Sequence, residues 1–281
     1  MKLRYETRHA LFLFGCYLLT TLILVVVCFP LYWMLITSLK PLDEIFDVPP
    51  TMLPVQPTLS NYKNLFLITD FGRLFLNSLK VSTGTTLFAL TVATLGAYSL
   101  TRFEYPGREL FGRTILFTYM FPGVLMIIPL VVIFARLGLT DTHTGLVLAN
   151  TTFALPFSLW VLRSFFQGIP LDLEEAAMID GAGRLGAFWD VVLPQALPGI
   201  IATGIFTFIW SWNEYLFALV LISTESLKTL PPGMMNFISA TNIDWGLVMA
   251  ASVLITLPMA IVFMFVQKHL VTGIGAGGVK G

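Results

Sequence analysis

Charged residues are scarce in this chain. Aspartate, glutamate, lysine and arginine make up 11% of its 281 residues, against roughly 25% in a typical soluble domain. Because 56% of the residues are hydrophobic, the folded chain could not cover its surface with polar groups, which predicts a membrane protein. The net charge of zero at pH 7 argues against binding to nucleic acid.

Cysteine, histidine and catalytic motifs are also rare. Cys16 and Cys28 fall in one apolar segment, where a helix would hold them about 18 Å apart, beyond the roughly 7 Å that a disulfide spans. His9, His143 and His269 form no metal-ligand grouping. The sequence contains no G-x-x-x-x-G-K-[ST] phosphate loop and no paired side chains of an intramembrane enzyme. We therefore expect no cofactor, no metal and no catalytic site in this chain.

Long apolar runs predict an all-α, polytopic membrane protein, since a helix needs about 20 apolar residues to cross a bilayer. The first run is too long for the core of a signal peptide, so we expect it to be retained. Lysine and arginine favour an orientation with both termini in the cytoplasm. Six segments qualify as transmembrane helices: 10–36, 76–101, 113–136, 144–167, 199–222 and 246–268.

The segment 38–75 is rich in proline, which predicts an extended outer loop followed by a short interfacial element. We therefore divide the chain into 1–75, with the first span and this loop, and 76–281, a five-helix core. The core includes a cytoplasmic loop at about 168–198 and a C-terminal tail. The prolines of the outer segment are Pro41, Pro49, Pro50, Pro54 and Pro57.

The cytoplasmic loop contains an unusually charged stretch, EEAAMIDGAGRLGAFWDVVLP, from Glu174 to Pro194. Asp172, three residues before Glu175, resembles a capping box at the start of a short helix. Gly181 would end this helix in a left-handed conformation, and a second short helix over 184–192 would end before Pro194. One face of the first helix would carry Leu173, Ala176, Ala177 and Asp180.

The spacing of Glu175-Ala176-Ala177, Gly181 and Val191-Val192-Leu193-Pro194 resembles the EAA loop of bacterial ABC-importer permeases. Val191 stands where the family commonly has isoleucine. FIWSWNEYLFALVLIS (208–223), GIGAGGVKG (273–281) and Asn61-Tyr62 are similar to carbohydrate-uptake permeases of the maltose type. The resemblance implies a type I ABC importer transmembrane domain with six helices in the bacterial inner membrane.

This resemblance also implies partners and a function. The loop would dock on a cytoplasmic ATPase dimer that binds ATP and Mg²⁺, while a second, related permease would complete the pore. An extracytoplasmic binding protein would deliver a sugar, which alternating access would carry inward. The glycine-rich tail would either contact the ATPase or be disordered. The residues expected in ATPase coupling are Glu174, Glu175, Ala176, Ala177, Asp180, Gly181, Leu193 and Pro194.

Trp212-Asn213-Glu214-Tyr215 lies in the fifth predicted span. An ionisable group within a span suggests a functional site. Asn213 and Glu214 could bind sugar hydroxyls while Trp212 or Tyr215 stacks on a sugar face. Alternatively, the same residues could fix packing against the partner permease or lie near the outer interface.

Two further features have open interpretations. Kinks at prolines could serve gating or only static packing, and the hydroxyl residues of the second span could mediate close packing or line a pore. A self-contained secondary transporter is a rival, but it would show several charges within spans and repeated halves. An ABC permease for another solute also remains open. The residues concerned are Pro122, Pro129, Pro156 and Pro258, and Ser82, Thr83, Thr85, Thr86, Thr91 and Thr94.

Overall fold

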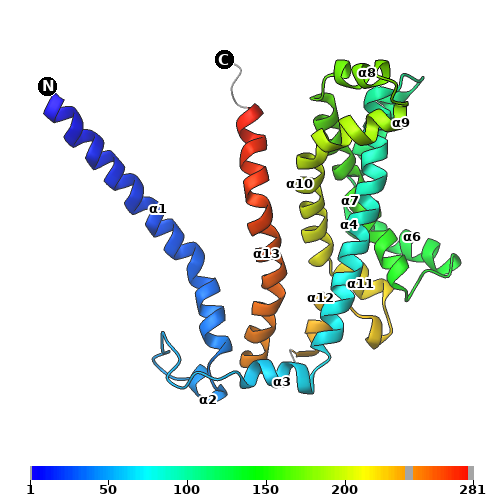
Figure 1. Ribbon diagram of the computed structural model, residues 1–281. Coiled ribbons are helices and arrows are strands. Elements are labelled where there is room, and N and C mark those ends of the chain that lie inside the picture. Colours follow the sequence, from blue (N-terminus) through cyan, green and yellow to red (C-terminus); the bar gives the residue numbers. More distant parts are fainter. Residues whose placement is uncertain (1, 238–242, 278–281) are drawn as a thin grey trace. The chain divides into compact units, whose positions relative to one another are not determined.

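Helices make up nearly all of the regular structure in the computed structural model, which describes residues 2–237 and 243–277 (Figure 1). A π-helical turn, η1 (Phe188–Val192), joins α9 to α10, and η2 (Glu225–Leu227) and η3 (Met234–Phe237) are 3-10 turns. The α-helices are α1 (Lys2–Ser38), α2 (Leu42–Ile45), α3 (Ser60–Ile68), α4 (Phe71–Arg102), α5 (Arg108–Thr118), α6 (Gly123–Arg136), α7 (His143–Gln167), α8 (Leu171–Ile179), α9 (Arg184–Ala187), α10 (Leu193–Trp212), α11 (Leu216–Leu221), α12 (Leu230–Gly233) and α13 (Trp245–Gly277).

Five helical segments are long and apolar enough to cross a membrane on their own, and a bent pair of helices brings the number to as many as six. The predicted all-α, polytopic fold is therefore confirmed. The five segments are His9–Ser38, Phe71–Arg102, His143–Gln167, Arg184–Trp212 and Trp245–Met264.

The third predicted span is not one straight helix. It consists of α5 and α6, which meet at an angle of 102°. Pro122 is the N-cap of α6, and a proline disfavours helical backbone at the residue before it, here Phe121. The predicted interruption at Pro122 is thus a sharp bend. Pro129, Pro156 and Pro258, by contrast, lie within continuous helices.

The fifth and sixth predicted spans have different limits from those expected. The fifth helix ends at Trp212 instead of 222, and the short α11 follows after a break. The last helix extends to Gly277, so it includes part of the predicted tail. Residues 278–281 of that tail lie outside the described residues.

The chain divides into two units, Met1–Asp70 with Phe237–Leu257, and Phe71–Asn236 with Pro258–Gly281. The first boundary lies close to the predicted one at 75/76, whereas Phe237–Leu257 is grouped with the N-terminal unit.

Side-chain contacts to the backbone organise the proline-rich part of the first unit, where residues 46–59 form no helix. The amide of Asn61 donates to the carbonyls of Ser38 and Lys40, at 2.9 and 2.8 Å, and so fixes α3 to the end of α1. The Lys40 ammonium donates to the Thr51 carbonyl at 2.5 Å, and the Glu44 carboxylate accepts the Thr51 hydroxyl at 2.8 Å. The loop is therefore held by buried polar groups rather than by regular structure.

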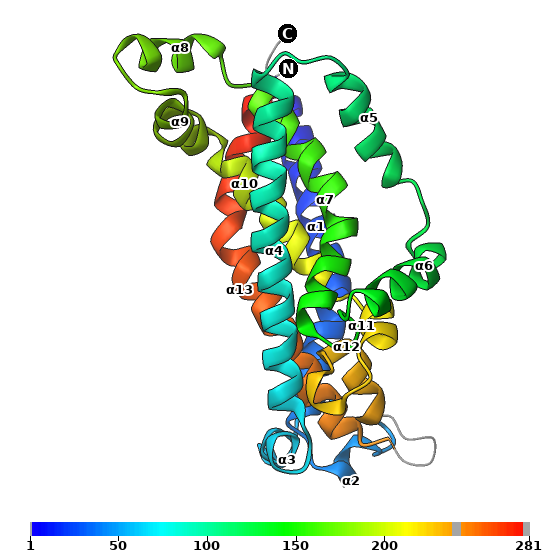
Figure 2. The same ribbon diagram turned by 90° about the vertical axis from the view of Figure 1, so that its right-hand side faces the viewer.

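Helices α4, α7 and α10 lie side by side in the second unit (Figures 1 and 2). Their close approach depends on small residues, as is usual between membrane helices. A β-carbon on Gly199 would lie 2.4 Å from the Phe165 ring, and one on Gly204 would lie 2.9 Å from Leu90.

Buried hydroxyl and amide groups also connect α7 to α10. The hydroxyls of Ser158 on α7 and Thr207 on α10 are 3.1 Å apart, and the Asn150 amide donates to the Ser211 hydroxyl at 3.0 Å. On α4, Ser82, Thr85 and Thr94 are buried whereas Thr83 and Thr91 are exposed. The packing interpretation therefore holds for the three buried residues.

Candidate functional site

A tight reversal of the chain follows helix α8. Gly181 has a φ of +96°, a conformation that a side chain disfavours. Its N–H donates to the Met178 carbonyl at 3.2 Å, and the N–H of Ala182 donates to the Ala177 carbonyl at 3.0 Å. This pair of bonds is a Schellman motif, the usual glycine-dependent helix end. The predicted left-handed stop at Gly181 is confirmed.

The predicted start of α8 is wrong. Asp172 is the second residue of the helix, and the N-cap is Pro170, which makes no side-chain cap bond. Proline is well suited to this end of a helix because its missing N–H would have no partner there. Asp172 and Glu174 still place negative charge in the first turn, where its interaction with the helix dipole stabilises the helix.

The predicted helix end before Pro194 is also wrong. The helix that begins at α9 continues through η1 into α10, and the N–H of Leu193 donates to the Phe188 carbonyl, five residues earlier. In a regular α-helix the ring of Pro194 would clash with the carbonyl four residues before it. The wider π turn, a feature often found at functional sites, accommodates this proline without a break.

The α8–α9 corner, residues 171–190, presents an exposed surface at the end of α4 and α7 (Figures 1 and 2). Glu175, Ala176 and Asp180 are exposed, as is Gly181, whereas Ala177 is half-buried. Large apolar side chains accompany them: Ile179 is 85% exposed, Leu185 74% and Trp189 60%. An exposed patch of large apolar side chains is typical of a surface that contacts another protein or a membrane.

Leu193 and Pro194 lie on α10, beyond this corner. Leu193 is half-buried and packs against a core formed by α4, α7 and α10, whereas Pro194 is exposed. Of the residues predicted for coupling, these two belong to the base of a span.

Glu174 points into the protein, unlike its neighbour Glu175. Its carboxylate accepts a hydrogen bond from the Tyr98 hydroxyl and pairs with the Arg102 guanidinium at 2.9 Å. Both side chains of this ion pair are 5% exposed. Arg102 also donates to the Ile169 carbonyl at 2.9 Å. Removing one partner of a buried ion pair generally costs about 3–5 kcal/mol, so this contact fixes α8 to α4.

Aromatic rings surround the buried ion pair. The Tyr98 ring lies 4.7 Å from Phe188 and 5.7 Å from Phe103, edge to face in both cases. The Arg184 guanidinium lies 4.9 Å from the centre of the Phe103 ring, in cation–π geometry. These contacts tie α9 and η1 to the same end of α4.

A second ion pair lies near this end of the second unit. Arg163 on α7 donates to the Glu109 carboxylate on α5 at 2.6 Å, and its guanidinium lies 5.4 Å from the centre of the Trp160 ring. Glu109 is half exposed. This pair connects α7 to α5 and involves no residue of α8.

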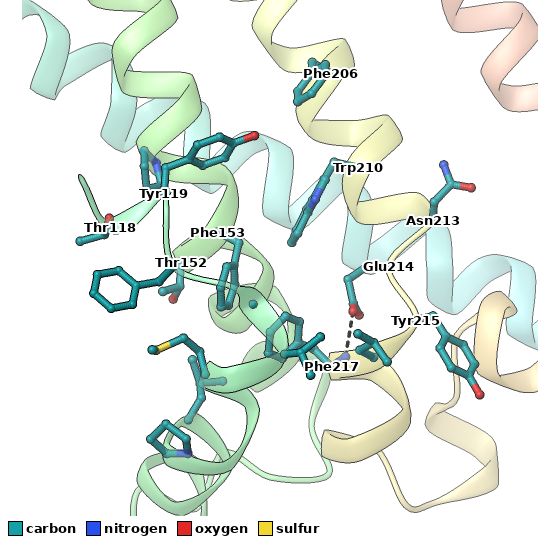
Figure 3. Close-up of a pocket in the computed structure, with 18 of the residues that line it drawn as sticks. Thr118, Tyr119, Thr152, Phe153, Phe206, Trp210, Asn213, Glu214, Tyr215 and Phe217 are labelled. Atoms are coloured by element: carbon teal, nitrogen blue, oxygen red, sulfur yellow. Dashed lines mark hydrogen bonds between the residues drawn. The ribbon is translucent and has the colours of Figure 1, made fainter. Parts of the chain in front are cut away.

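A cavity of about 1100 Å³ lies between α6, α7, α10 and α11. Aromatic rings form much of its wall: the Phe153 ring stacks with Phe217 at 4.7 Å and with Trp210 at 6.4 Å (Figure 3). The hydroxyls of Thr118 and Thr152 provide polar groups. The cavity thus combines flat apolar surfaces with a few hydrogen-bonding groups.

The four residues predicted for a substrate pathway do not all face this cavity. Asn213, Glu214 and Tyr215 line it, but Trp212 is 2% exposed and packs edge-on against Phe75 at 5.4 Å. Of the two rings predicted to stack on a sugar, Trp212 is therefore closed off from the cavity in this structure, whereas Tyr215 lines it. Trp210, which the sequence did not single out, also lines the cavity.

Glu214 and Asn213 have local structural roles. The Glu214 carboxylate accepts the N–H groups of Phe217 and Ala218 at 2.8 and 3.0 Å, and so satisfies the start of α11 (Figure 3). The Asn213 amide donates to the Ile209 carbonyl at 2.8 Å, at the end of α10. These backbone hydrogen bonds of Asn213 and Glu214 explain why the fifth helix ends at Trp212.

Two sets of residues were missed by sequence reasoning. Tyr98 and Arg102, the partners of Glu174, could have been suspected from a lone arginine at the end of a span. The aromatic wall is signalled by Phe153 on α7 and by two rings four residues apart on α10, Phe206 and Trp210. Within the part of the chain that the structure describes, no three His, Cys, Asp or Glu side chains are grouped to hold a metal.

Comparison with known proteins identifies the family. Residues 90–275 match the model of the binding-protein-dependent transport system inner membrane component family. The chain is 38% identical to the inner membrane ABC transporter permease protein YcjP of Escherichia coli, over 95% of this chain and 96% of the relative. It is 35% identical to the trehalose transport system permease protein SugB of Mycobacterium tuberculosis, over 94% and 96%.

A solved structure has the same fold. A chain of a bacterial ABC transporter involved in the import of the acidic polysaccharide alginate superposes with a TM-score of 0.82 at 25% identity, covering 92% of this chain and 96% of that one. The chain therefore belongs to the family of inner-membrane permease components of binding-protein-dependent ABC transporters. The predicted membership is confirmed, as is the prediction of a multi-pass transport subunit rather than an enzyme.

Proposed function

We propose that this chain is one of two related permease subunits that form the pathway of a carbohydrate importer. An ATPase dimer, holding ATP and Mg²⁺, would act on the α8–α9 corner from the cytoplasm, and an extracytoplasmic binding protein would deliver the cargo. Both termini would then be cytoplasmic. Residues 9–32 of the first span are all exposed in this chain, and their apolar surface suits contact with lipid.

The observation that carries the proposed coupling is the exposed corner between α8 and α9. Its surface combines a carboxylate, Glu175, with the small Ala176 and the apolar Ile179, Leu185 and Trp189. Leaving such apolar side chains in water is unfavourable by about 25 cal/mol for each Å². An ATPase surface with a cationic group and an apolar cleft would cover the patch and pair with Glu175.

Charge reversal at Glu175 tests this proposal. The assembled transporter should co-purify with its ATPase, and Glu175→Lys should weaken that association and abolish ATP-driven uptake. The matched control is Glu104→Lys, which makes the same charge change at an exposed residue of the α4–α5 loop outside the corner. Full uptake by Glu175→Lys, or uptake by the wild-type chain without any ATPase, would refute the proposal.

A carbohydrate is the cargo that the comparisons and the cavity favour. Trehalose is named for one relative and alginate for the solved transporter. Sugars combine apolar ring faces with hydroxyl groups, and the cavity offers Trp210 and Phe153 beside Thr152 and Asn213. We include Trp210 in the proposed substrate pathway in place of Trp212.

Identifying the ligand of the binding protein encoded beside this chain is the direct test of the cargo. That protein should be purified without added sugar, and its tightly bound ligand identified by mass spectrometry. A mono- or oligosaccharide, or a sugar derivative, supports the proposal. An amino acid, peptide or inorganic ion would overturn the carbohydrate assignment and leave the ABC permease assignment intact.

A further inference from the structure

The contacts of α8 suggest which helix moves with it, an inference that rests on the proposed coupling to an ATPase. From the sequence, movement of the corner should pass to the fourth and fifth spans, because these adjoin it in the chain. The structure adds a third connection, to the end of α4. We propose that α4 carries the movement of α8 across the membrane, and that Glu174 is the positioning residue that attaches α8 to α4.

The attachment is made by side chains that are shielded from water. Glu174 on α8 meets Tyr98 and Arg102 on α4, and its ion pair with Arg102 is 5% exposed on both sides. A surface ion pair would bend or dissociate under load, since such pairs contribute only about 0–1 kcal/mol. A buried pair with a second hydrogen bond holds its geometry far more strongly.

Arg102 makes the attachment more rigid. Its guanidinium donates to Glu174 through Nε and to the Ile169 carbonyl through a terminal nitrogen, at 2.9 Å in both cases. Ile169 lies in the short connection between α7 and α8. One planar group therefore fixes both the helix α8 and the turn that leads into it.

Helix α4 differs from the other spans in that it contains no proline over its 32 residues. Each of the other four single-helix spans in the described part of the chain contains one or more: Pro30 in α1, Pro156 in α7, Pro194 and Pro198 in the α9–α10 segment, and Pro258 in α13. Prolines kink helices and break their hydrogen bonding. A displacement at one end of α4 is thus transmitted to the other with the least bending.

At its opposite end, α4 is hydrogen-bonded to the segment 226–230, which would therefore move with it. The Asn77 amide donates to the carbonyls of Ser226 and Lys228, at 2.9 Å each, and the Ser78 hydroxyl accepts the Leu230 N–H at 2.7 Å. Asn77 and Arg102 are separated by about 37 Å of helix, more than the roughly 30 Å of hydrocarbon. A shift of α8 would therefore move the 226–230 segment on the far side of the membrane.

Spin labels at the two ends of this path test the proposal in the assembled complex. Cys16 and Cys28, both exposed in α1, are first replaced by serine. One nitroxide is then placed on Asp172, at the start of α8, and in a separate sample on Leu76, which is 54% exposed at the far end of α4. The measurement is the change in line shape and in nickel-reagent accessibility between the ADP state and the ATP–vanadate state.

With Glu174 intact, we expect both labels to respond to nucleotide. In Glu174→Gln, the response at position 172 should persist while that at position 76 falls at least about fivefold, as expected when the coupling free energy between two sites is lost. Arg102→Met should have the same effect, and the double variant should be no worse than either single one, because both changes remove one interaction. Glu109→Gln, which removes the ion pair between Arg163 and Glu109, should leave both responses unchanged.

The outcomes separate this proposal from the proposed function. No response at position 172 in the chain with Glu174 intact would overturn the proposed docking of the corner. A full response at position 76 in Glu174→Gln would overturn the role of α4 and leave the docking intact. Should Glu174→Gln fail to assemble, Tyr98→Phe keeps the ring and removes only the hydroxyl: a response reduced roughly twofold supports the proposal, and an unchanged one overturns it.

Discussion

The aromatic ring of Phe165 on α7 rests directly against the backbone of Gly199 on α10. A β-carbon at position 199 would lie 2.4 Å from the ring, so helix and ring would have to separate. We predict that Gly199→Ala lowers the free energy of unfolding by about 1–3 kcal/mol, as for other overpacked cores. Thermal unfolding in detergent measures this change.

Gly15→Ala is the matched control for that variant. Gly15 lies within α1 and has no atom within 4 Å of an added β-carbon, so alanine should stabilise the helix by roughly 0.5–1 kcal/mol. If Gly199→Ala were as stable as Gly15→Ala, the close approach of α7 and α10 would be disproved.

Gly181→Ala should disturb the α8–α9 corner. The φ of +96° at Gly181 costs a residue with a β-carbon about 1–2 kcal/mol, so the Schellman motif should loosen. We expect weaker co-purification with the ATPase and little change in the thermal stability of the spans. Gly183→Ala, at a glycine with φ −71° and open space around it, should behave as wild type. Equal behaviour of the two variants would show that the left-handed turn is not needed for docking.

Replacement of two tryptophans, two positions apart, should affect different properties, stability in one case and uptake in the other. Trp212→Ala removes a ring that is 2% exposed, and should destabilise the protein by about 3–5 kcal/mol. Trp210→Ala removes a ring of the cavity wall, and should reduce sugar uptake roughly tenfold, the effect of losing about 1.4 kcal/mol of binding. Thermal unfolding and uptake in proteoliposomes distinguish the two effects. Normal uptake in a well-folded Trp210→Ala variant would exclude Trp210 from the pathway.

Asp141 should make one loop contact sensitive to acid. The Thr224 hydroxyl and N–H and the Ser223 N–H donate to its carboxylate, at 2.5, 2.9 and 2.9 Å, and these bonds hold the pKa of Asp141 below its usual value. A depressed pKa in the folded state contributes stability above the unfolded-state value, and this stability disappears as pH falls through the folded-state value. The loss should therefore begin near pH 4 and continue below it.

Asp141→Asn isolates this effect. Asparagine tolerates the left-handed conformation at position 141, where φ is 55°, as well as aspartate does, but it has no charge to lose. Thermal stability measured between about pH 5 and pH 3 should fall more steeply for the wild type than for Asp141→Asn. Parallel curves for the two proteins would show that Asp141 does not contribute to the acid response.

The sequence predicted the approximate position of most spans, because the length and apolarity of a membrane helix are local properties, but not the 102° bend in the third. It also predicted the stop at Gly181, where one residue type determines the backbone. It failed at Pro194, because a π turn lets a proline enter a continuous helix, and that adjustment depends on packing of Phe188 and Val192 in the core. The end of the fifth helix at Trp212 likewise depends on the hydrogen bonds that Glu214 makes, which the sequence does not show.

The candidate sites were harder to predict for a different reason. Glu174 and Glu175 are chemically identical, and only the position of Arg102, distant in the sequence, determines which of them is buried. Trp210 and Trp212 differ in the same way, because the orientation of α10 turns one ring to the cavity and the other to Phe75. Sequence patterns indicate that such residues exist on a helix, whereas the tertiary arrangement decides what each of them contacts.

Because of the π turn at Phe188–Val192, the number of residues between the corner and the fifth span determines how the corner is oriented. Deleting one residue from the turn would remove the space that accommodates Pro194 and rotate the segment before it by about 100° around the axis of α10. That rotation would move Glu174 away from Arg102, its partner in the buried ion pair. The number of residues between Gly181 and Pro194 thus determines the rotational position of the corner around the axis of α10. Insertions or deletions there should be tolerated far less than substitutions.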